Sequence, residues 1–194
     1  SFDTFHPERC CNGLRNLSIS FNSIPSLHCD LFRISSLVTL LVDHNCLETI
    51  PDIGQESQLF YERLQWFDIG FNLFHELPEA LRYATNLASL GIGGIQLGGI
   101  KQYICINMPS LTRLDVCCNR IRKVPEDFRK MKSLTYLNIE DNAFTAIPDE
   151  IYVMTMLQSL LLAGNPIDVI PSWAPALSNL SQVSLANTKV ASMP

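Results

Sequence analysis

The chain has 194 residues, of which 47% are hydrophobic and 17% are charged, and its formal net charge at neutral pH is −5. This much apolar material predicts a sizeable core and excludes a wholly disordered chain. No apolar run reaches the roughly 18–20 residues of a membrane-spanning helix, and the acidic balance argues against nucleic-acid binding.

One pattern recurs along the chain: apolar residues at its first, fourth and sixth positions, asparagine at the ninth and an apolar residue at the eleventh. All 24 of the first three slots are apolar, where chance would fill about half. The pattern therefore predicts a repeated structural unit. The eight repeats begin at Leu14, Leu37, Leu64, Leu87, Leu111, Leu134, Leu157 and Leu180, mostly 23 residues apart.

Two further columns mark each repeat. The asparagine slot holds Asn22, Asn45, Asn72, Asn119, Asn142 and Asn165, with Ile95 and Thr188 as departures. Proline follows six residues later in six repeats, while His28 and Lys101 break that column. An amide both donates and accepts hydrogen bonds, so we expect the asparagines to form a structural ladder on backbone groups where the chain leaves each strand.

These motifs resemble the leucine-rich repeat superfamily over nearly the whole chain, from Leu14 to Pro194. Repeat six, L-T-Y-L-N-I-E-D-N-A-F-T-A-I-P-D-E-I, is similar to the short repeats of intracellular Ras-associated scaffolds. The resemblance implies an α/β solenoid, a right-handed horseshoe. A parallel β-sheet would form its concave face, and short helices, 3-10 turns and loops its convex face.

The residues support the same arrangement independently. Residues 136–140 alternate outward and inward with period two, as expected for a strand with one buried face. One repeat cannot bury that face alone, so neighbouring repeats must stack. The segments 78–81, 125–128 and 148–151 place proline and acids where a helix begins.

Two places interrupt the repeat. Four extra residues fall within 52–63, and we expect this insertion to form a loop on the back or edge of the solenoid. Repeat four contains Gly91, Gly93 and Gly94, but glutamine stands where a dinucleotide-binding fingerprint needs its third glycine. The cluster instead predicts a degenerate repeat with a locally bare strand, whose outward glycines would let a partner approach the backbone.

The ends suggest the domain organisation. Residues 1–13 form an N-terminal flank too short for a substantial cap, and 14–194 form a single domain of eight repeats. Because the last repeat is incomplete, we expect the chain to be a segment of a longer protein with flanking domains.

The seven cysteines indicate a compartment. They contain no Cys-x-x-Cys spacing, and the four histidines form no ligand motif, so we expect neither a metal nor a cofactor. The odd count favours reduced thiols and a cytoplasmic protein. An extracellular location is the alternative, because Asn16 and Asn179 begin glycosylation sequons.

Stacking places equivalent outward residues of successive repeats side by side on the concave face. Repeats three to six then gather exposed aromatic residues ringed by charge, which is typical of an interaction hot spot. The candidate partner-binding residues are Trp66, Asp68, Phe71, Arg113, Asp115, Tyr136, Asn138, Glu140 and Asp141. The excess of acids predicts a partner with a basic patch, or one that accepts aromatic side chains.

Catalysis is not expected. Asp68 and Asp115 stand about 10 Å apart on strand spacing, and no histidine aligns with Cys117 or Cys118 to activate a nucleophile. The sequence thus predicts a non-catalytic scaffold that binds another protein, without nucleic-acid binding or membrane insertion. Two alternatives are a regulatory or targeting region of a larger phosphatase, cyclase or kinase, and an extracellular recognition ectodomain.

Overall fold

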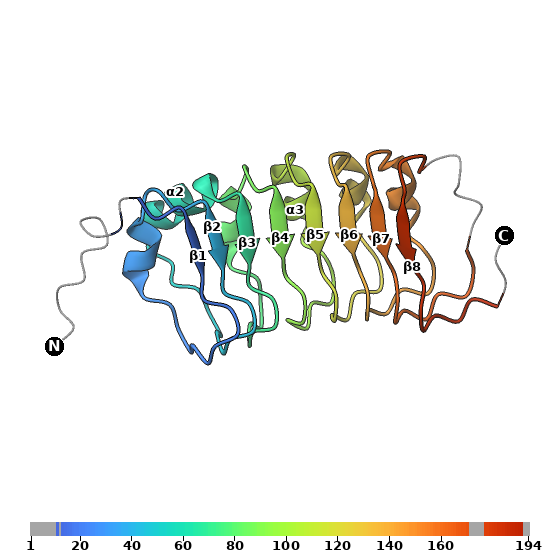
Figure 1. The fold of residues 1–194 in the computed structure, drawn as a ribbon, viewed down its shortest axis with the longest axis horizontal. Helices are drawn as coiled ribbons and strands as arrows, with labels where there is room; N and C mark the ends of the chain where they lie inside the picture. The colour runs from blue at the N-terminus through green and yellow to red at the C-terminus, as the bar shows by residue number, and fades with distance from the viewer. Residues whose placement is uncertain (1–10, 12, 171–176, 192–194) are drawn as a thin grey trace.

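The computed structural model describes residues 11, 13–170 and 177–191 of the chain. Eight parallel strands lie side by side in chain order in a single sheet (Figure 1). Each strand has three residues and falls within the first six positions of its repeat, as the alternation predicts. The strands are β1 (Asn16–Ser18), β2 (Thr39–Leu41), β3 (Trp66–Asp68), β4 (Ser89–Gly91), β5 (Arg113–Asp115), β6 (Tyr136–Asn138), β7 (Ser159–Leu161) and β8 (Gln182–Ser184).

The strand register confirms the predicted columns. Trp66 pairs with Ser89, and Ser89 pairs in turn with Arg113 and Arg113 with Tyr136. Within each strand the middle side chain points inward, whereas the first and third face away from the helices. We call the outer surface on this side of the solenoid the sheet face. In each repeat it consists of the first and third strand residues, at positions three and five, and of the residues at positions seven and eight.

The return segments lie on the other side of the sheet, behind the strands in Figure 1. Four are 3-10 helices of five residues: η1 (Cys29–Arg33), η2 (Glu79–Tyr83), η3 (Glu126–Lys130) and η4 (Asp149–Val153). Pro78, Pro125 and Pro148 immediately precede the last three, and acids occupy each first turn. Proline fixes a backbone angle that suits a helix start, and the acids favour the positive end of the helix dipole.

The insertion in repeat two forms an α-helix rather than the expected loop. Helix α2 (Gln55–Arg63) lies on the helical side of the solenoid and begins after Gly54, whose N–H donates to Asp52 Oδ1 over 2.9 Å. Its Phe60 and Tyr61 are buried, and each packs edge-on against another aromatic ring at 4.8–5.7 Å between ring centroids. The extra residues form a helix because they supply an apolar side that the core can bury.

Repeat four also returns through an α-helix, α3 (Gln102–Asn107), although it lacks the proline. Ile104 and Cys105 face the core from this helix. Within the described ranges, none of the helices has the length and apolar character to cross a membrane.

One continuous core runs through the stack between the sheet and the return segments. The central strand residues Leu40, Leu90, Leu114, Leu137 and Leu160 have no exposed surface. Each contacts its equivalents in the neighbouring repeats, so burial along this row is shared by the whole array. At the C-terminal strand the equivalent Val183 remains 40% exposed, since no described repeat follows it.

The buried asparagines form a ladder of hydrogen bonds between repeats. Asn72 illustrates it: its Oδ1 accepts the N–H of Leu47 from the previous repeat, and its Nδ2 donates to carbonyls of Val42, Ile69 and Gly70. Asn45, Asn119, Asn142 and Asn165 make the equivalent set. Asn22, in the first repeat, is exposed, and among the described residues its side chain donates only to carbonyls of its own turn.

The residue before each asparagine slot adopts a left-handed backbone conformation. Its φ lies between 50° and 69° in all eight repeats. Such a residue interrupts the alternation of a strand, so two consecutive side chains, for example those of Cys117 and Cys118, both lie on the sheet face. The sheet face is therefore wider than the three-residue strands alone would make it.

Candidate functional site

Trp66 is the most prominent aromatic side chain in the middle of the sheet face. It begins β3, with the small residues Thr39 and Ser89 beside it in the register, and its side chain is 50% exposed. Neither neighbour is large enough to cover an indole. A large half-exposed ring on a rigid strand is a typical anchor for a protein partner.

Arg113 and Tyr136 form a pair two strands further along. They are neighbours in the register of β5 and β6, and the guanidinium carbon of Arg113 lies 3.5 Å from the centre of the Tyr136 ring. This cation–π contact holds two long side chains in place over the sheet. Burial raises the pKa of Tyr136, so the phenol stays neutral and keeps its donor proton.

Acidic side chains at and just after the third strand positions are linked by hydrogen bonds across repeats. Asp115 accepts hydrogen bonds from the N–H of Cys117 at 3.1 Å and from Nδ2 of Asn138 at 3.0 Å. Asn138 Oδ1 accepts the N–H of Glu140 at 3.0 Å, and Glu140 Oε1 accepts from the Ser184 hydroxyl at 2.8 Å. These bonds fix the carboxylates relative to the strands.

Asn138 differs from the other predicted contact residues because it is buried. Its amide bridges Asp115 and the backbone of Glu140, and only 7% of the residue is accessible to a partner. The sequence pattern placed Asn138 on the sheet face, which is correct, but neighbouring side chains cover it. Its role in the structure is to position the two acids.

The strand glycines Gly91, Gly93 and Gly94 of repeat four are wholly or partly covered, contrary to the expectation of a bare strand. Gly91 and Gly93 are buried, and a Cβ on Gly91 would collide with the Asp68 carboxylate. At Gly94 a Cβ would lie 2.5 Å from the Phe71 ring. At Gly91 and Gly94 side chains of repeat three lean over repeat four, and at Gly93 the Cys117 side chain of repeat five lies 3.0 Å from a would-be Cβ, so little backbone is open to a partner there.

This packing gives a prediction for Gly94→Ala. Gly94 has a φ of +63°, where an alanine is strained, and the added Cβ would push the Phe71 ring away. We expect the free energy of unfolding to fall by about 2 kcal/mol. Gly98→Ala is the matched control, since no atom lies within 4 Å of its would-be Cβ, and should change stability by less than about 0.5 kcal/mol. Equal effects in urea denaturation would contradict the leaning arrangement.

Phe71 is the end of an aromatic stack that the sequence analysis only partly identified. Phe21, His44 and Phe71 occupy the left-handed position of successive repeats. The His44 ring stacks on Phe21 at 4.2 Å and on Phe71 at 4.4 Å between centroids. Phe21 is 75% exposed and Phe71 39%. All three residues stand in the same column of the repeat alignment, so this column predicts that Phe21 and His44 lie beside Phe71.

Asp68 is the most perturbed acid of the sheet face. Burial raises its pKa to about 6, with Asp43 and Asp115 adding to the effect, while the Gly70 N–H, which donates to it over 2.9 Å, opposes it. A carboxylate kept in an unfavourable environment is more common at functional sites than in ordinary surface positions. The raised pKa of Asp68 therefore supports the acid-lined middle of the sheet face as the candidate binding site.

The raised pKa of Asp68 predicts how stability depends on pH. The folded state binds this proton more tightly than the unfolded state, so the stabilisation is present below the unfolded pKa of about 3.9 and is lost as pH rises through about 6. Asp68→Asn retains an oxygen acceptor for Gly70 and removes the charge. Near pH 8 it should raise the free energy of unfolding by about 2 kcal/mol, with little effect near pH 4. Urea denaturation at both pH values tests this, and a gain independent of pH would contradict it.

The cysteines of the sheet face are poor candidates for nucleophiles. Cys118 Sγ lies 3.7 Å from Asp141 Oδ2, and Asp115 is beside Cys117. Burial and the nearby acids raise the pKa of both thiols, so the reactive thiolate is disfavoured. No disulfide joins the six cysteines that the structure describes.

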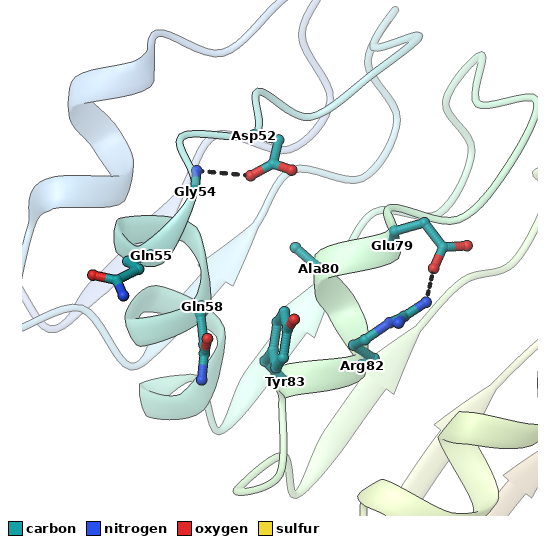
Figure 2. Close-up of a pocket in the computed structure, with 8 residues that line it drawn as sticks. All are labelled: Asp52, Gly54, Gln55, Gln58, Glu79, Ala80, Arg82 and Tyr83. Atoms are coloured by element: carbon teal, nitrogen blue, oxygen red, sulfur yellow. Dashed lines mark hydrogen bonds and ion pairs between the residues drawn. The ribbon is translucent and has the colours of Figure 1, made fainter.

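A cleft of about 390 Å³ opens on the helical side between α2 and η2 (Figure 2). Its lining includes the amides of Gln55 and Gln58, the phenol of Tyr83 and the ion pair between Arg82 and Glu79. The Arg82 guanidinium points to Glu79 rather than into the cleft in Figure 2. The lining contains no histidine, cysteine or serine.

The fold and the surface together define a solenoid of stacked repeats with a parallel sheet as one face. Residues 109–167 match the family model described as Leucine rich repeat. The chain therefore has the leucine-rich repeat fold, and the part over residues 109–167 matches the leucine-rich repeat family in sequence as well.

Solved structures with the same fold come from several organisms. A leucine-rich repeat protein of Leptospira interrogans matches 94% of this chain with 23% identity and a TM-score of 0.83. An internalin of Listeria monocytogenes matches 97% with 20% identity and a TM-score of 0.75. The ectodomain of the receptor kinase GASSHO1/SCHENGEN3 from Arabidopsis thaliana, in complex with CASPARIAN STRIP INTEGRITY FACTOR 2, matches 92% with 27% identity and a TM-score of 0.71. This chain spans 45%, 53% and 22% of those three chains, respectively.

Proposed function

We propose that the protein is a non-catalytic scaffold that binds a partner protein on its sheet face. The observation that carries the proposal is the half-exposed Trp66, held on a rigid strand of the same face as the Arg113–Tyr136 pair, which begins two strands away. A sheet fixed by a continuous core loses little conformational freedom on binding, so contacts made there are not offset by a large ordering cost.

Charge favours a partner with a basic surface. The sheet face over β2 to β6 carries five carboxylates, those of Asp43, Asp68, Asp115, Glu140 and Asp141. The positively charged Arg113 lies among them, and its guanidinium already contacts Tyr136. Opposite charge on a partner would speed association and select against acidic competitors. We therefore propose that lysine or arginine side chains approach the acids while Trp66 supplies apolar contact.

Affinity capture with wild-type protein and the Trp66→Ala and Tyr136→Ala variants tests the proposal. Proteins that bind the sheet face should be recovered with wild type and lost with both variants. Leu59→Ala is the matched control, because Leu59 is also 50% exposed but lies on α2 at the helical side. Recovery that is unchanged in both sheet-face variants would refute binding at this surface.

Recognition of a protein or peptide by a receptor ectodomain is the second candidate function. The solved complex of GASSHO1/SCHENGEN3 with CASPARIAN STRIP INTEGRITY FACTOR 2 favours it, since that receptor ectodomain shares this fold. The six free cysteines among the described residues favour instead a reducing compartment such as the cytoplasm, which we retain as the proposed location.

A further inference from the structure

Three potential metal ligands come together on the helical side of the first repeat. His28, Cys29 and Asp30 are consecutive, and one donor atom from each lies within 4.8 Å of the other two. His28 occupies the position that holds proline in six other repeats, so this repeat alone has an imidazole there. We propose that these three side chains bind a divalent ion of the zinc class.

The Asp30 carboxylate is already oriented for such a role. Its Oδ1 accepts from Arg33 Nη1 at 3.0 Å, whereas its Oδ2 lies 3.2 Å from His28 Nδ1. Arg33 also contacts Glu56 Oε2 at 3.3 Å, so its charge is shared between two acids. One oxygen of Asp30 is thus held by a supporting side chain and the other faces the imidazole, as is usual for a carboxylate that ligates a metal.

The close approach of His28 Nδ1 and Asp30 Oδ2, at 3.2 Å, places a nitrogen and an oxygen ligand beside each other. His28 Nδ1 accepts the backbone N–H of Asp30 at 3.3 Å, so the lone pair of the neutral ring is on that nitrogen. Nδ1 and Oδ2 are then two acceptors facing each other. A metal ion between the two atoms would replace the long hydrogen bond on Nδ1 and attract both of them.

The donor types select the class of ion. A thiol sulfur, an imidazole nitrogen and a carboxylate oxygen suit zinc and similar transition metals, while calcium and magnesium prefer oxygen alone. The donors must move closer to reach one ion, and the His28 side chain, 76% exposed, is free to rotate. Three protein ligands leave a fourth tetrahedral position for water, and binding releases the Cys29 thiol proton.

Zn²⁺ binding by the purified chain, measured in competition with a chromophoric chelator near pH 7.5, tests the proposal. We expect His28→Ala and Cys29→Ser each to weaken binding by at least about tenfold. The matched controls are His75→Ala and Cys46→Ser, which remove an exposed histidine and an exposed cysteine outside the trio and should bind as wild type does.

Alkylation of Cys29 by iodoacetamide, followed by mass spectrometry, gives a second readout on the unmodified chain. Zn²⁺ should slow the reaction at Cys29 and Mg²⁺ should not, and the protection should disappear in His28→Ala. Absence of zinc protection overturns the proposal, and so does an equal loss of affinity in the trio variants and the controls.

Discussion

Replacing Asn119 by leucine is expected to lower the free energy of unfolding by about 3–5 kcal/mol, the largest stability effect that we predict for a single side chain. Asn119 Oδ1 accepts two backbone N–H groups, from Ile95 at 3.2 Å and Leu97 at 2.9 Å. Its Nδ2 donates to three carbonyls, in its own and the preceding repeat. Leucine matches the volume but leaves these buried groups without their partner.

Asn22→Leu provides the matched control. Asn22 occupies the same slot of the first repeat, but it is exposed and its side chain donates only to the carbonyls of Ile19 and Ser20. Water can replace those bonds, so we expect a loss below about 1 kcal/mol. Urea denaturation of both variants gives the comparison. Similar losses would mean that the ladder contributes little beyond the local turn.

The sequence predicts the fold well because every repeat buries side chains at the same positions. An inward residue at positions one, four and six of each repeat determines which residues face out, and aligning the repeats on these positions predicts the register even where a repeat is longer. The pairing of Asp68 with Gly91 and of Gly91 with Asp115 follows from counting alone. The family resemblance implies the same parallel sheet.

The sequence does not predict how outward side chains lean along the solenoid. A repeat template gives the face on which a residue lies, but whether it tilts onto the next repeat depends on the space available there. Asp68 and Phe71 lean onto glycines of repeat four, and Asn138 is buried by its neighbours. To predict whether an outward side chain is accessible, one must also consider the sizes of the side chains next to it in the same column.

The insertion at 52–63 shows a second limit. Its length identified a departure from the repeat, but its conformation is set by Phe60 and Tyr61, which are buried against rings outside the insertion. The spacing between repeats shows only how many residues are added, not which structure they form. The metal-ligand trio is a third case, since consecutive ligands match none of the spacings by which zinc sites are found in a sequence.

Trp66→Ala is expected to weaken binding of a sheet-face partner by at least about 2 kcal/mol, or about thirtyfold in Kd. The same substitution should change the free energy of unfolding by less than about 1 kcal/mol, because half of the indole is exposed and its register neighbours are Thr39 and Ser89. Titration calorimetry with a partner recovered by capture measures the first quantity, and urea denaturation the second.

The comparison with Leu59→Ala separates a specific contact from a general loss of apolar surface. Both side chains are 50% exposed, but one lies on β3 and the other on α2 across the core. If partner binding depends on the sheet face, only Trp66→Ala reduces affinity while both variants remain folded. If Leu59→Ala reduces affinity equally, the loss reflects removal of apolar surface in general, and specific binding at the sheet face is refuted.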